Sequence, residues 1–174
     1  MGIRVDYSGR NFIKIPSLEN FKRIETLVLR NNAIAKLGKI EQLLYVKELN
    51  LASNQLISTN AIGLLKDLVS LDVSNNRIKS VDGLCNLAKL EKLVLSGNTI
   101  TKAPNLSQLT RLVYLDLSFN KLSTLPYLGS CVNRLETLYL DGNHISSLES
   151  AGRSLPAVIR VLGLSKNVIK DLSQ

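Results

Sequence analysis

The sequence predicts a solenoid, a stack of short coils in which each coil buries an apolar face against its neighbours. Three observations lead to this prediction. A Leu-x-Leu pair followed by Asn-x-Leu recurs along the chain, the spacing is 22 to 24 residues, and every full copy keeps its Asn in phase with its apolar pair. A fixed period of this length is the sequence sign of a repeat architecture.

Residues 112–128, LVYLDLSFNKLSTLPYL, show the repeat most plainly. With Leu112 as position one, the apolar pair takes positions four and six and Asn120 takes position nine. Alternation of apolar and variable residues over positions three to seven predicts a short strand with one buried face. The apolar pair recurs in seven repeats, as Leu27/Leu29, Leu49/Leu51, Leu71/Val73, Leu93/Leu95, Leu115/Leu117, Leu138/Leu140 and Leu162/Leu164.

Position nine predicts a ladder of buried amides. Each amide offers two donors and an acceptor, so it can satisfy backbone groups of adjacent coils where the chain turns inward. The residues of this asparagine ladder are Asn32, Asn54, Asn76, Asn98, Asn120, Asn143 and Asn167.

The repeats follow one another in order within a single domain, residues 1–174. Residues 1–23 form a degenerate first repeat, with Val5 and Tyr7 as the apolar pair, Phe12 at position eleven and Arg10 in place of Asn. Repeats two to five continue without insertion. Repeat six carries one extra residue near 129–133, and repeat seven carries two near 148–156, where we expect a somewhat longer helical turn.

The last repeat, residues 159–173, is followed by no polar cap in this sequence. Solenoids need such a cap. Without it, Leu162, Leu164 and Ile169 would expose their outer edge beside an unpaired strand. We therefore expect that a longer parent chain continues beyond this point, or that a partner or a second copy covers this end.

The repeated residues resemble those of the leucine-rich repeat family, and the resemblance covers essentially the whole chain. The 22-residue form is similar to the class named after a regulatory subunit of protein phosphatase 1, to the leucine-rich light chain of axonemal dynein and to the spliceosomal A-prime protein. The resemblance implies an α/β fold of about eight repeats, with a concave parallel sheet and short helical or 3-10 turns on the convex side. It also suggests phosphatase-regulatory, cytoskeletal or ciliary roles.

The cysteines favour an intracellular protein. Cys85 and Cys131 should lie about two strand spacings apart, roughly 10 Å, which is beyond the reach of a disulfide. Secreted members of the family usually carry cysteine-rich caps, and this sequence has none. The N-terminus lacks a signal-peptide core, and no run is long and apolar enough to span a membrane. We expect a cytoplasmic, cytoskeletal or ciliary location, with the nucleus as an alternative.

The variable strand positions predict a protein-binding surface on the concave face. They hold four basic and five acidic residues, whereas the whole chain has a net charge of +8, so the basic excess lies elsewhere. Three of only eight Phe and Tyr residues gather there in neighbouring repeats. Exposed aromatics beside charges are typical of binding hot spots. The predicted partner-binding residues are Asp72, Lys92, Val94, Tyr114, Asp116, Phe119, Tyr139 and Asp141.

A basic rim is the second candidate site. Arg23, Lys89 and Arg111 occupy position 22, just before a strand, and Arg134 is their equivalent after the insertion. The rim suggests an alternative function, a ribonucleoprotein component that attracts nucleic acid or another acidic partner. The alternative interpretation is that these residues are ordinary solvent-exposed charges without a binding role.

Catalysis finds no support in the sequence. His144 is the only histidine, and although Asp141, Ser146 and Ser147 are near it in sequence, neighbouring solenoid positions diverge. No phosphate-binding glycine loop and no His/Cys metal spacing occur. We therefore expect a non-enzymatic scaffold with protein partners and with no cofactor or metal.

Overall fold

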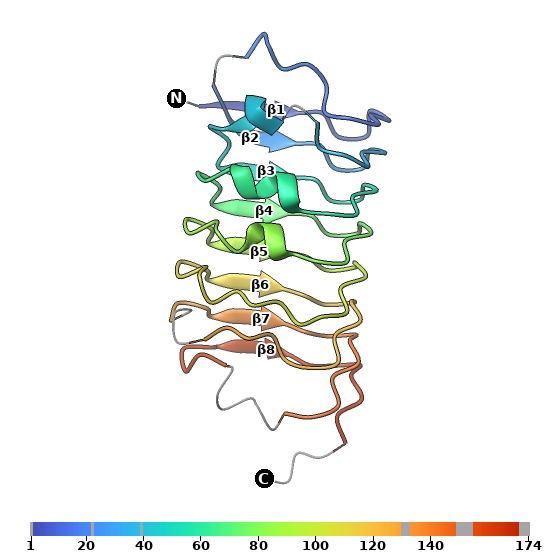
Figure 1. Cartoon of the computed structure of the whole chain (residues 1–174), viewed down its shortest axis with the longest axis vertical. Helices are drawn as coiled ribbons and strands as arrows, with labels where there is room; N and C mark the ends of the chain where they lie inside the picture. The colour runs from blue at the N-terminus through green and yellow to red at the C-terminus, as the bar shows by residue number, and fades with distance from the viewer. Residues whose placement is uncertain (1, 22, 39, 130–132, 149–154, 171–174) are drawn as a thin grey trace.

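The computed structural model describes residues 2–21, 23–38, 40–129, 133–148 and 155–170. Its central feature is one eight-stranded sheet whose strands follow each other in chain order and are all parallel (Figure 1). The strands are β1 (Ile3–Asp6), β2 (Ile24–Val28), β3 (Glu48–Asn50), β4 (Ser70–Asp72), β5 (Lys92–Val94), β6 (Tyr114–Asp116), β7 (Thr137–Tyr139) and β8 (Val161–Gly163).

The strand register follows the sequence period. Leu93 of β5 pairs with Leu115 of β6, and Leu115 pairs with Leu138 of β7, so equal repeat positions lie side by side. The degenerate first repeat joins the same sheet, because β1 pairs in parallel with β2. Residues at one repeat position therefore form columns that run along the whole stack.

The return segments lie over one face of the sheet and carry the few helical turns (Figure 1). These are the 3-10 helices η1 (Ile40–Leu43), η2 (Asn60–Leu64) and η3 (Asp82–Leu84). Gly63 and Gly83 let η2 and η3 approach closely, since a Cβ on Gly83 would lie 2.5 Å from Cα of Asn60. The predicted fold, a solenoid with a parallel sheet and short turns opposite it, is confirmed.

One continuous apolar core fills the space between the strands and the return segments. Leu115, Leu117 and Leu122 of the sixth repeat are completely buried. Leu162 of β8 is 40 % exposed, whereas its counterpart Leu138 is completely buried, so the described residues leave the outer side of the last coil open. Cys131 and most of the two predicted insertions lie outside the described residues. No helix in the described part of the chain has the length and apolar character that crossing a membrane requires.

The amides at position nine link each coil to the preceding one. Asn120 donates from Nδ2 to the carbonyls of Leu117, in its own repeat, and Leu95, in the preceding repeat, at 3.0 Å each. Its Oδ1 accepts from the N–H of Ile100 at 3.0 Å. The same bonds recur at every ladder position from Asn32 to Asn167. Position nine therefore supplies both the inward turn and the bond between coils.

We expect Asn120→Ala to lower the free energy of unfolding by about 1–3 kcal/mol, because the buried N–H of Ile100 loses its acceptor. Chemical denaturation followed by circular dichroism measures the change. Asn32→Ala is the matched control and should cost less, since Asn32 is only half-buried and water can replace its amide. Equal losses at both positions would contradict the role assigned to burial.

Candidate functional site

The outward side chains of β5, β6 and β7 bring most of the predicted partner-binding residues together. In each strand the central leucine points into the core, and the residues on either side point to the solvent. The register places Lys92 beside Tyr114, and it places Asp116 between Val94 and Tyr139. A contiguous surface results, built from consecutive repeats.

An aromatic row runs across these strands. The Nζ atom of Lys92 lies 5.2 Å from the centroid of the Tyr114 ring, and that ring meets Tyr139 edge-on at 5.9 Å between centroids. A Cβ on Gly163 of β8 would lie 2.7 Å from Cδ1 of Tyr139, so the glycine leaves room for that ring. We call Lys92, Tyr114 and Tyr139 the aromatic patch; Phe119 contacts Gly142 and Lys166 instead.

Phe119 is held in a conformation that its side chain disfavours. Its φ is +53°, in the left-handed region where bulky residues are outliers, and its side chain is 56 % exposed. The ring lies against Gly142 of the next repeat, where a Cβ would come within 2.6 Å of Cδ1, and Nζ of Lys166 lies 5.8 Å from its centroid. All position-eight residues share this conformation: Gly9, Asn31, Ser53, Asn75, Gly97, Phe119, Gly142 and Lys166.

The predicted carboxylates bind backbone as well as facing the solvent. Asp72 and Asp116 each accept a hydrogen bond from the N–H two residues further on, at 3.0 and 2.9 Å. Asp141 accepts one from the N–H of Ser165 in the next repeat at 2.9 Å. The second oxygen of Asp72 accepts from Nδ2 of Asn50 at 3.3 Å, and the second oxygen of Asp141 lies close to Gly163 of β8. The sequence analysis missed this structural role of the aspartates.

Burial of the Tyr114 ring, followed by the nearby carboxylate of Asp116, raises the pKa of its hydroxyl. Both causes disfavour the phenolate, so at neutral pH the patch presents a neutral phenol that can donate a hydrogen bond.

We expect Tyr114 to ionise at a higher pH than an unperturbed tyrosine, because its pKa is raised. Ultraviolet absorbance titration of the protein and of Tyr114→Phe isolates its contribution by difference. Tyr127→Phe, which removes an exposed tyrosine outside the patch, is the matched control. A difference curve for Tyr114 with an ordinary or lowered midpoint would contradict the description of its surroundings.

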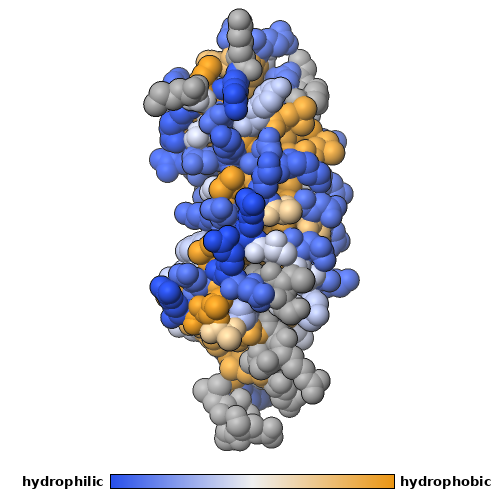
Figure 2. Space-filling model, turned by 90° about the vertical axis from the view of Figure 1, so that its left-hand side faces the viewer, coloured by the Kyte–Doolittle hydropathy of each residue, from blue (hydrophilic) through white to orange (hydrophobic). Residues whose placement is uncertain are grey.

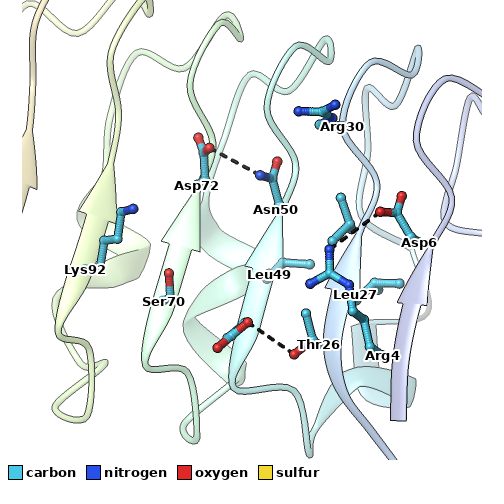
Figure 3. A pocket seen from close by; sticks show the side chains of 12 residues that line it. Arg4, Asp6, Thr26, Leu27, Arg30, Leu49, Asn50, Ser70, Asp72 and Lys92 are labelled. Carbon is cyan, nitrogen blue, oxygen red and sulfur yellow. Dashed lines mark hydrogen bonds and ion pairs between the residues drawn. The ribbon is translucent and has the colours of Figure 1, made fainter.

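The N-terminal half of the sheet face carries a shallow hollow that the sequence analysis did not foresee. It encloses about 380 Å³ and shares only Asp72 and Lys92 with the predicted site (Figure 3). Its polar groups bind each other: Arg4 and Asp6 form an ion pair at 3.6 Å, and Thr26 donates to the Glu48 carboxylate at 3.2 Å. The hollow is therefore polar, and it adjoins the aromatic patch at Lys92.

The predicted basic rim lies along the edge where the strands begin, away from the aromatic patch. Figure 2 views this side, where hydrophilic residues predominate between small apolar areas. Two of its four cations form ion pairs: Arg23 with Glu25 at 3.3 Å and Lys89 with Asp67 at 2.6 Å. Glu25 also binds Lys47 at 3.2 Å. Arg111 and Arg134 are exposed. A continuous basic stripe is thus absent from this edge of the described structure.

Within the described residues, no group of three or more His, Cys, Asp and Glu side chains could hold a metal ion. His144 is exposed at position ten, on the outer edge of its coil.

Parts of this chain match known protein families. Residues 88–130 match the family described as Leucine Rich repeats (2 copies), and residues 67–87 and 134–155 match the family described as Leucine Rich Repeat. No curated protein sequence matches the chain.

Solved structures with the same architecture include three from Listeria monocytogenes. An internalin (InlF) is 26 % identical with a TM-score of 0.78, and the match covers 88 % of this chain and 45 % of that one. Internalin C2 is 28 % identical with a TM-score of 0.83, over 97 % and 73 % of the two chains. The functional domain of InlJ, which includes a cysteine ladder, is 22 % identical with a TM-score of 0.73, over 92 % and 34 %, and shows the fold alone. The chain thus spans less than half of the InlF and InlJ chains.

The stacked parallel strands define a class of solenoid that is typical of protein-binding scaffolds. Its strand register and asparagine ladder, together with the family matches, identify the particular family. The chain belongs to the leucine-rich repeat family.

We expect Phe119→Asn to raise the free energy of unfolding by up to about 1 kcal/mol, since Asn tolerates the left-handed conformation better than Phe. Asn31 and Asn75 already occupy this position. Phe119→Ala is the control, because it removes the same ring but keeps a residue that disfavours this φ. Thermal and chemical denaturation compare the two. If both variants lose stability equally, packing of the ring on Gly142 outweighs the strain.

Proposed function

We propose that this protein is a non-enzymatic interaction scaffold that binds a folded protein, or a helix of one, on the exposed face of its sheet. The observation that carries the proposal is the aromatic patch, in which Tyr114 and Tyr139 form an edge-on pair flanked by Lys92. Both rings are half-buried and therefore keep apolar surface available to a partner.

The patch has the physical properties of a binding hot spot. Its rings are held by neighbouring strands, so little side-chain entropy is lost when a partner covers them. Phe119, which follows β6, is exposed and offers further apolar surface. The carboxylates of Asp116 and Asp141 stand beside the rings and can accept hydrogen bonds or pair with basic groups at the border of an interface.

The finer roles rest on the resemblance of the 22-residue repeats. From this resemblance we propose phosphatase regulation or a cytoskeletal or ciliary role. We also propose an intracellular location, which the free thiol of Cys85 supports. The alternative, a ribonucleoprotein component that uses the basic rim, loses ground because Arg23 and Lys89 are already paired with acids.

We expect Tyr114→Ala combined with Tyr139→Ala to weaken partner binding at least tenfold, because truncating hot-spot aromatics typically costs about 2 kcal/mol or more. Partners captured from a lysate by the intact protein are identified by mass spectrometry, and the affinity of the purified partner is then measured by calorimetry. The thermal melt should barely move, since neither ring is part of the buried core.

The matched control is Thr26→Ala combined with Ser70→Ala. It shortens two side chains that occupy, in β2 and β4, the strand position that Tyr114 occupies in β6. This variant should bind as the intact protein does. The proposal fails if the two double variants bind the partner equally well, or if the control alone loses binding.

A further inference from the structure

A second charged surface lies on the edge opposite the basic rim, where the chain descends from the carboxyl ends of the strands. Position eleven is buried there in repeats two to seven, and positions ten, twelve and thirteen lie on either side of it. In repeats four to six these outer positions include four cations, which we call the basic flank: Arg77, Lys79, Lys102 and Lys121. All four side chains are exposed.

Backbone hydrogen bonds hold the coils that carry these cations in register. The N–H of Arg77 donates to the carbonyl of Leu56 at 2.8 Å, and the N–H of Lys121 donates to that of Ile100 at 2.9 Å. Each coil is therefore bonded to the previous one along this edge, as it is along the sheet. Neighbouring coils are consequently about 4.8 Å apart, and the four charges lie within about 15 Å of one another.

The charges of the flank are not compensated. In the first seven repeats, positions ten, twelve and thirteen contain no Asp or Glu. Among the described residues the ion pairs involve the rim, the sheet and the first strands, and none involves a flank cation. The nearest acid in sequence is Asp82, the first residue of η3, and it forms no ion pair with Lys79. Like charges this close repel each other, and a bound polyanion would relieve the repulsion.

The other side chains of the flank indicate which polyanion fits. They are mainly hydroxyls: Ser80, Thr101, Ser123 and Thr124 are all exposed. No aromatic side chain occupies an outer position in repeats four to six, so the flank lacks both the anchors of a protein interface and the stacking surface of a single-strand binder. Lysine, arginine and hydroxyl groups are the usual contacts to a nucleic-acid backbone.

We propose that the basic flank binds the phosphate backbone of a double-stranded nucleic acid without reading its sequence. The flank lies at a different edge from the aromatic patch, and the inference does not depend on the function proposed for that patch. It also differs from the rim, whose cations are partly neutralised.

The test is fluorescence anisotropy with a labelled mixed-sequence DNA duplex of about 20 base pairs, titrated between about 50 and 200 mM salt. Lys79→Gln combined with Lys102→Gln removes two flank cations, and Arg111→Gln combined with Arg134→Gln removes two exposed rim cations. Both double variants lower the net charge by two. A difference between them therefore reports the position of the charges and not the net charge of the protein. The flank variant loses two phosphate contacts, so the slope of log K against log salt should fall in magnitude by about 2. The rim variant should keep the slope of the intact protein.

Three results would overturn the proposal. The intact protein could fail to bind the duplex at low salt. The flank and rim variants could lose affinity equally, which would reduce the effect to net charge. A polyglutamate peptide or anionic phospholipid vesicles could bind the flank more tightly than the duplex, which would assign the surface to an acidic protein or to a membrane. Tyr114→Ala combined with Tyr139→Ala should bind the duplex normally, so this experiment and the partner test fail independently.

Discussion

The hydrogen bonds of the position-nine asparagines are the constraint on which the rest of this structure depends. The carbonyl of Leu95 accepts from Asn98 of its own repeat and from Asn120 of the next one. Each interior coil is therefore bonded to its successor through a buried amide. Because the bonds are the same at every step, the strands stack in register. That register in turn places side chains in columns and decides which residues can meet on the surface.

Much of the fold could be predicted from the sequence, because the repeat encodes it locally. The apolar pairs fix the strands, and Asn32 to Asn167 fix the turn that follows each strand; even the degenerate first repeat forms β1 where Val5 and Tyr7 suggested it. The gathering of Tyr114, Asp116 and Tyr139 follows from the same period. What the sequence could not supply depends on conformation and on pairing across repeats. The left-handed backbone of Phe119 and the hydrogen bond from the N–H of Ser165 to Asp141 are of this kind. The frequency of Gly and Asn at position eight was the available signal for that backbone.

The repeat presents three surfaces with different chemistry: the sheet face and the two edges beside it. The sheet face carries mixed charges and an aromatic patch, and its aspartates cap their own backbone, as Asp116 does for Ser118. The edge before the strands is partly neutralised by ion pairs, such as that between Lys89 and Asp67. The edge after the strands keeps its cations free. These differences arise only from the variable positions, since the buried positions are nearly identical from coil to coil.

The strictly sequential order of the strands has a mechanical consequence. Every strand pair joins neighbouring repeats, and within the described residues no strand pairs with one more than a single repeat away. The stack is therefore quasi-one-dimensional, and its cohesion is a sum of nearest-neighbour terms. Tension applied between its ends would not meet one global barrier. The repeats would unfold one after another from the end that is less covered, while the interior repeats remained folded.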